Sequence, residues 1–231
     1  MRRSSGGEGE PKRKTGGREL LPIGKPENRH GFTLVELLIV IAIVAIFAAI
    51  LLAVFPQGRE MARRAACASG VKQIVAAASM YAHDHDRRFI PAMTRGGPEG
   101  RRGYTWCVLI QPYLEDEEIL TCANDPDPRA TEDWVCLPHS YGLNYRYTCN
   151  TAFGWSPGAL TSKLTNVDQH SRRILVFEMD SSARDPGSGY LAHRLSRVEP
   201  RHGDRAVFGF VDGHAKALIP EETVQPFNMW E

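Results

Sequence analysis

The chain has 231 residues, which is long enough for one domain plus additional segments. Its 28 Lys and Arg residues nearly balance 27 Asp and Glu residues, so the net charge of +1 gives no indication of a nucleic-acid-binding protein. The charge is uneven along the chain, because the stretch before Gly31 is basic, rich in Gly and Pro and without apolar periodicity. We expect this stretch to lack regular structure.

An uninterrupted apolar run extends from Leu37 to Phe55. As a helix rising about 1.5 Å per residue, this run nearly matches the roughly 30 Å hydrocarbon thickness of a bilayer. It is too long for a cleaved secretory signal, and no A-x-A cleavage pattern follows it. We predict one membrane-spanning segment over residues 32–55, with the basic N-terminus in the cytoplasm and the C-terminal part in the periplasm or outside the cell.

The only charge in the spanning segment is Glu36, and a carboxylate in a membrane is costly without a partner. The hexapeptide Gly31-Phe32-Thr33-Leu34-Val35-Glu36, behind its basic segment, resembles the N-terminus of type IV prepilins and type II secretion pseudopilins. The resemblance implies that a prepilin peptidase cuts between Gly31 and Phe32, so that residues 1–31 are a cytoplasmic leader. It also implies that Phe32 is N-methylated. The alternative is a plain signal anchor that contains a glutamate.

In that family the carboxylate at the fifth mature position, here Glu36, meets the N-terminal amine of a neighbouring subunit during assembly. The pairing is physically reasonable, because a buried amine and a buried carboxylate each pay for desolvation unless they meet. The partners implied are therefore the prepilin peptidase, the inner membrane and other pilin or pseudopilin subunits.

The helix is expected to continue to about Arg88, with residues 56–88 as an amphipathic continuation. Pro56 is predicted to kink the helix or to loosen the turn before it. After Pro56 in the sequence, one apolar stripe with helical spacing should face a globular domain: Cys67, Val71, Ile74, Ala78 and Tyr81. The segment His83-Asp84-His85-Asp86 is interpreted as a polar helix terminus rather than a ligand set.

Residues 89–231 are predicted to form the exported globular domain. We expect a short helix or turn over 104–114, a strand or turn over 140–145 and a strand over 173–179. The predicted fold class is α+β and pilin-like, with the long helix on one face of a small antiparallel sheet whose other face is solvated.

Four of the five cysteines lie in this domain: Cys107, Cys122, Cys136 and Cys149. Their spacing lacks the close pairs of zinc sites, and disulfides persist in an exported domain, so we expect disulfides without being able to choose among three pairings. Cys67, in the helix, is interpreted as a small buried apolar residue. No metal or other cofactor is expected. The alternative is a calcium site at Asp125 and Asp127, although their spacing matches no EF-hand.

Near the C-terminus, two β-like runs over 206–211 and 214–219 flank Asp212-Gly213, which predicts a hairpin with a type I′ turn. His202 precedes Asp212 by ten positions. This H-x9-DG pattern, together with the segments SYGLN and CANDPD, resembles a planctomycete-type group of prepilin-like proteins. We expect His202 to hydrogen-bond a backbone group and to fix the hairpin to the core.

The predicted function is that of a structural pilus or pseudopilus subunit, not an enzyme. Two alternatives stay open. A membrane-anchored periplasmic enzyme would require its candidate residues to converge in one pocket: His83, His85, His202, Asp212 and His214. A ligand- or DNA-binding minor pilin would use a basic patch: Arg87, Arg88, Arg95, Arg101 and Arg102.

Overall fold

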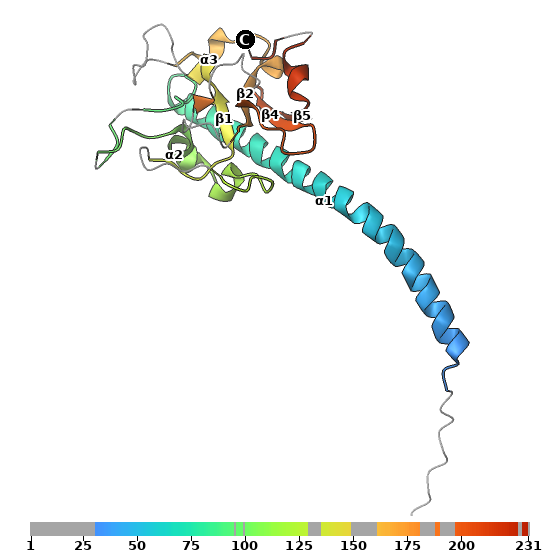
Figure 1. Cartoon of the computed structure of the whole chain (residues 1–231). Helices are drawn as coiled ribbons and strands as arrows, with labels where there is room; N and C mark the ends of the chain where they lie inside the picture. The colour runs from blue at the N-terminus through green and yellow to red at the C-terminus, as the bar shows by residue number, and fades with distance from the viewer. Residues whose placement is uncertain are drawn as a thin grey trace, which may run out of the picture. The chain divides into compact units, whose positions relative to one another are not determined.

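The computed structural model describes residues 31–94, 96–98, 100–128, 135–148, 161–180, 188–189, 197–225 and 228–230. Contacts divide the chain into two compact units, Met1–Ala49 and Ile50–Glu231, and each is described by itself. Helix α1 (Leu34–Asp84) contributes its first part to one unit and the rest to the other (Figure 1).

Helix α1 confirms the long helix predicted from Phe32 to Arg88, although the helix is a few residues shorter at each end. It runs through Pro56 without interruption, and the predicted kink stays a prediction. Beyond the helix, Asp86 and Arg87 adopt left-handed backbone conformations with φ of 52° and 57°. Such conformations are unfavourable within a helix of L-residues, so the chain turns away there.

The predicted stripe on α1 faces the core. Cys67, Val71, Ile74 and Ala78 are buried, and Tyr81 is half-buried. They pack with residues of α2 (Trp106–Ile110). Helix α2 confirms the short helix or turn expected over 104–114. The other short helices are η1 (Gln111–Tyr113), η2 (Glu117–Leu120), α3 (Tyr145–Thr148), η4 (Leu164–Asn166), η5 (His170–Arg172) and η7 (Pro220–Thr223).

The sheet of the second unit has five strands in the order β3-β1-β2-β4-β5. Their bounds are β1 (Tyr141–Asn144), β2 (Ile174–Glu178), β3 (Ser188–Gly189), β4 (Ala206–Phe210) and β5 (Ala215–Leu218). Four strands form the predicted antiparallel sheet, whereas the two-residue β3 adds a parallel edge beside β1. The strands predicted over 140–145, 173–179, 206–211 and 214–219 are all present.

Both faces of the sheet are covered, which corrects the prediction of one solvated face. On β4, Val207 belongs to the core on the α1 side, whereas Phe208 and Phe210 belong to a second core. This second core also contains Trp230, whose indole packs edge-on against Phe208 with ring centroids 6.0 Å apart. The run Ala206–Phe210 has no polar residue, as expected for a strand buried on both faces.

Helix α1 packs closely against the sheet at Gly209. A Cβ atom there would lie 2.6 Å from Cγ1 of Val71 and 2.7 Å from Cγ2 of Val75. A side chain at position 209 would therefore push α1 away from β4. This contact holds the part of α1 around Val71 and Val75 against β4.

Candidate functional site

The predicted processing site lies directly before α1, in the first unit. Thr33 and Glu36 form a capping box at the start of the helix. The backbone N–H of Glu36 donates to Oγ1 of Thr33 at 3.2 Å, and the backbone N–H of Thr33 donates to Oε2 of Glu36 at 2.9 Å. The Thr33 hydroxyl also donates to Oε2 at 2.8 Å. Glu36 therefore helps to cap the start of the helix and also carries the only charge of the predicted span.

The helix behind this box is apolar and exposed. Every residue from Gly31 to Arg59 is exposed, and Leu52 and Phe55 keep 76% and 72% of their surface. Helix α1 is long and apolar enough to cross a membrane, by length and composition. So many exposed large apolar side chains require a lipid or protein environment that the single chain does not supply.

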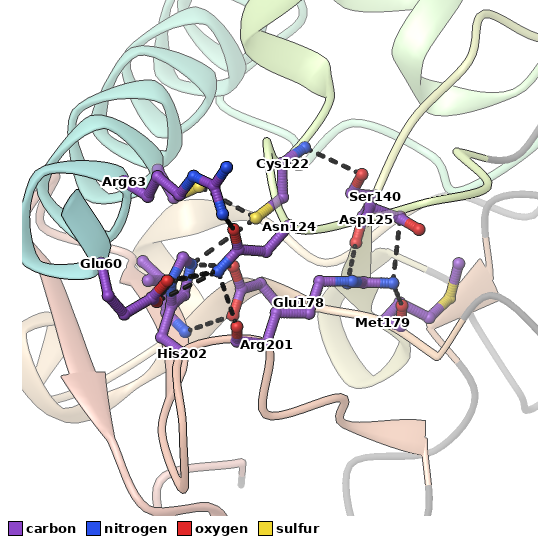
Figure 2. Close-up of polar contacts among 12 residues, drawn as sticks. Glu60, Arg63, Cys122, Asn124, Asp125, Ser140, Glu178, Met179, Arg201 and His202 are labelled. Carbon is purple, nitrogen blue, oxygen red and sulfur yellow. Dashed lines mark hydrogen bonds and ion pairs between the residues drawn. The ribbon is translucent and has the colours of Figure 1, made fainter. Parts of the chain in front are cut away.

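A second site is a buried polar cluster in the unit Ile50–Glu231, centred on His202 (Figure 2). The His202 side chain is fully buried, and each ring nitrogen faces a carboxylate. Nδ1 lies 2.8 Å from Oε1 of Glu60 on α1, and Nε2 lies 3.1 Å from Oε1 of Glu178 at the end of β2. The other oxygen of Glu178 accepts the backbone N–H of Val207 at 2.9 Å. His202 thus connects α1 to the sheet through two acids.

The loop after η2 closes this cluster. The Asn124 side-chain amide donates to both carboxylate oxygens of Glu60 at 3.0 Å, and its carbonyl oxygen accepts from Arg63 at 3.0 Å. Arg201, next to His202, pairs with Asp125 at 3.0 Å. Its guanidinium also donates to the backbone carbonyls of Ser140 and Met179 (Figure 2). Helix, loop and sheet are therefore joined by polar contacts as well as by the apolar core.

These contacts shift the pKa values of the cluster. Burial lowers the pKa of His202, but hydrogen bonding to Cys67 and Glu178 and the charge of Glu178 outweigh burial and raise this pKa to about 10. The hydrogen bonds from Asn124 and His202 lower the pKa of Glu60. At neutral pH the cluster holds an imidazolium cation between two carboxylates, which is the arrangement that offsets the burial of charge.

Four of the five cysteines lie within the described residues, as two close pairs of thiols. The sulfur atoms of Cys107 and Cys136 are 3.8 Å apart, and those of Cys67 and Cys122 are 2.9 Å apart. The interpretation of Cys67 as a mere small apolar residue is therefore incomplete. The predicted disulfides stay a prediction, and Cys149 lies outside the described residues.

Two groups of side chains have the composition of a metal site. One comprises Cys67, Cys122, Glu178 and His202, and the other Cys107, Cys136 and His139; within each group the ligand atoms lie within 4.8 Å of one another. Thiolate, imidazole and carboxylate are the ligands that zinc takes in proteins. Of the two residues of the calcium alternative, Asp125 forms an ion pair with Arg201 and Asp127 is exposed.

The hairpin of the H-x9-DG pattern is confirmed, but its turn is not of type I′. Only Gly213 has a positive φ, of 100°, and the loop is three residues long. The backbone N–H of Gly213 donates to the carbonyl of Phe210 at 2.9 Å, and the N–H of Phe210 donates to the carbonyl of His214 at 2.9 Å. Asp212 pairs with His214 on the exposed turn. The His202 ring binds the side-chain carboxylates of Glu60 and Glu178 instead of the backbone group that was predicted.

The residues of the enzyme alternative lie in three different places. His202 is in the buried cluster, and Asp212 and His214 form the exposed hairpin turn. His83 and His85 are exposed at the end of α1, where His85 stacks on Tyr81. Among the described residues, neither potential metal-ligand group contains any of these candidates except His202.

The basic patch of the DNA-binding alternative is only partly described. Arg95 lies outside the described residues, and Arg88 donates to the carbonyl of Thr161 at 2.8 Å. Arg87, Arg101 and Arg102 are exposed.

Sequence reasoning missed Glu60, Glu178 and the contact of Cys67 with Cys122. Glu60 and Glu178 occur in no motif, and the residues joined by His202 are 142 and 24 positions away from it. The capping box was visible in the sequence as Thr33-x-x-Glu36 before an apolar run.

Two family models match parts of the chain. The model described as "Prokaryotic N-terminal methylation motif" matches residues 27–52, which include Gly31, Phe32 and Glu36. The model described as "Protein of unknown function (DUF1559)" matches residues 56–135, which include Glu60, Cys67 and Cys122. Comparison with curated proteins and with solved structures finds no match.

Neither match reaches His202, so the H-x9-DG resemblance stays a prediction. The methylation motif lies where the sequence pattern predicted processing, and the apolar helix with its antiparallel sheet has the expected pilin-like α+β architecture. The chain is therefore a prepilin-like protein that carries the prokaryotic N-terminal methylation motif.

Proposed function

We propose that the chain is a structural subunit of a type IV pilus or a type II secretion pseudopilus. In this proposal, prepilin peptidase cuts between Gly31 and Phe32 and Phe32 is N-methylated. The observation that carries the proposal is the methylation motif over residues 27–52, which includes the start of the exposed apolar helix α1. The same apolar surface would lie in the inner membrane before assembly and against neighbouring helices in the filament.

Glu36 has a particular role in this proposal. Both hydrogen bonds from Thr33 go to Oε2, so the second carboxylate oxygen can accept the N-terminal amine of an adjoining subunit. In a water-free helix bundle this charge-assisted contact would select the axial position of each incoming subunit. The basic leader keeps the N-terminus cytoplasmic, so the unit Ile50–Glu231 would be exported.

The substitution Glu36→Gln separates helix capping from pairing with the amine. Glutamine serves in a capping box as glutamate does, but it carries no charge. We expect the variant to be cut and methylated normally and to be nearly missing from filaments sheared from cells. Gly31→Val, the control for processing, should leave the chain uncut. Wild-type filament yield from Glu36→Gln would show that the carboxylate acts only as a cap.

The enzyme alternative requires convergence of residues that the structure places apart, and no described pocket joins them. The DNA-binding alternative predicts salt-sensitive retention of DNA, which is lost when the arginines are neutralised. Neither alternative is favoured by a contact within the described residues.

A further inference from the structure

Two cysteines from distant parts of the chain meet beside His202. Cys67 lies on the buried stripe of α1, and Cys122 lies in the loop after η2. Their sulfur atoms are 2.9 Å apart, and the residues keep only 5% and 2% of their surface. We propose that Cys67 and Cys122 form a disulfide bond in the exported protein. This inference rests on the proposed function in one respect, namely that the unit Ile50–Glu231 leaves the cytoplasm.

The two cysteines are brought together by contacts that do not involve sulfur. Asn124, two residues after Cys122, binds Glu60 and Arg63 on α1. The backbone N–H of Cys122 donates to Oγ of Ser140 at 2.9 Å, just before β1. The loop is thus fixed to the helix on one side and to the sheet on the other. A pair held in this way needs little rearrangement to form a bond.

The same sulfurs also belong to the group with Glu178 and His202, so zinc is the competing ligand. Two thiolates on one tetrahedral zinc ion stand about 3.8 Å apart. A disulfide requires about 2.05 Å, and the observed 2.9 Å lies between the two values. The sulfur atoms would have to approach by less than about 1 Å to form the bond. Zinc would also require His202 to lose the Nε2 proton that it donates to Glu178.

The bond also agrees with the charges of the cluster. Without a metal, His202 balances Glu60 and Glu178 as an imidazolium, and each ring nitrogen has its acceptor. A neutral disulfide adds no charge to this balance. A zinc ion with two thiolates would replace an arrangement in which these buried polar groups already have partners.

The oxidation is a thiol–disulfide exchange with the disulfide of another protein in the compartment into which the unit Ile50–Glu231 is exported. The Cys67 thiolate attacks one sulfur of that disulfide and releases the other as a thiolate. Cys122 then loses its proton and displaces the bound sulfur, so two thiols are oxidised and the partner's disulfide is reduced to two thiols. Hydrogen bonds from Cys122 and His202 lower the pKa of Cys67, which favours the attacking thiolate. Cys67 also lines a surface pocket of about 360 Å³.

The bridge would join α1 covalently to the globular part of the same unit. In the proposed filament, a covalent link at Cys67 would keep α1 joined to the loop after η2 even if the apolar contact between α1 and β4 opened.

The test uses the full chain recovered from native membranes, with free thiols alkylated at the moment of lysis. Digestion with trypsin and Glu-C at mildly acidic pH places all five cysteines in separate peptides, with Cys67 in residues 65–72 and Cys122 in 119–129. The expected result is one linked species of these two peptides that disappears on reduction. The Cys67→Ser variant should leave Cys122 alkylated and is the matched control for disulfide exchange during preparation.

Three results would overturn the inference: both peptides alkylated, Cys122 linked to Cys107, Cys136 or Cys149, or stoichiometric zinc in native mass spectra with both thiols retained. The N-terminus of the same sample separates this inference from the proposed function. A mature N-terminus at Phe32 with alkylated Cys67 and Cys122 rejects only the bridge. A linked pair on an uncut chain supports the bridge and rejects the processing.

Discussion

Replacing His202 with leucine tests whether the buried cluster holds α1 to the sheet. The substitution keeps an apolar side chain of moderate size but removes the cation between Glu60 and Glu178. The Glu178 side chain is fully buried, so it would be left without its charged partner. Removing one partner of a buried ion pair typically costs about 3–5 kcal/mol of unfolding free energy, and we expect a loss in this range. For a domain of this size each kcal/mol lowers Tm by about 2–4 °C, so we expect a fall of about 6–20 °C.

The assay is thermal unfolding of the full chain in detergent at pH 7, followed by near-ultraviolet circular dichroism. His83→Leu is the matched control, because His83 lies at the end of α1 with 87% of its side chain accessible. We expect the control to change the unfolding free energy by no more than about 0.5 kcal/mol. A loss below about 1 kcal/mol for His202→Leu, similar to that of the control, would refute the role of the cluster.

Three other perturbations follow from the same contacts. With free thiols the pKa of His202 is raised from 6.5 to about 10, so the stabilisation by its imidazolium is complete below about pH 6.5 and is lost as pH rises through about 10. In the presence of reductant, the Tm of the wild type should therefore fall between pH 7 and 10 more steeply than that of Glu178→Gln, and parallel curves would contradict this. Gly209→Ala should cost about 1–3 kcal/mol by pushing α1 from the sheet, whereas Gly58→Ala, with no atom within 4 Å, should be neutral or stabilising in the same denaturation series. Reducing a bond that closes the 55-residue separation of Cys67 and Cys122 should lower the unfolding free energy by about 4 kcal/mol, and a Tm unchanged by reductant would argue against that bond.

The fold was largely predictable because its main elements have strong local patterns. The apolar run and the stripe through Val71 and Ile74 define α1, and Asp212-Gly213 between two β-like runs defines the β4–β5 hairpin. The prediction of a type I′ turn was wrong, because Asp-Gly alone does not distinguish a two-residue hairpin loop from a three-residue one. The covered second face of the sheet depends on Trp230, whose position no local pattern reveals.

The two sites differ in how far sequence could predict them. The processing segment is contiguous, so its spacing is visible directly and agrees with the matched motif over residues 27–52. The buried cluster assembles Glu60, Cys122, Glu178 and His202 from four separate parts of the chain. Its members become neighbours only after α1 packs on the sheet, and an isolated glutamate in a strand or helix carries no signal of a distant histidine.

The proposed assignment as a processed filament subunit is tested most directly by the intact mass and N-terminal sequence of the protein from membranes, with and without an active prepilin peptidase. We expect an N-terminus at methylated Phe32 when the peptidase is active and the uncut chain when it is absent. An uncut chain in both strains would contradict the proposed function and would reduce the segment from Gly31 to Glu36 to part of a plain signal anchor.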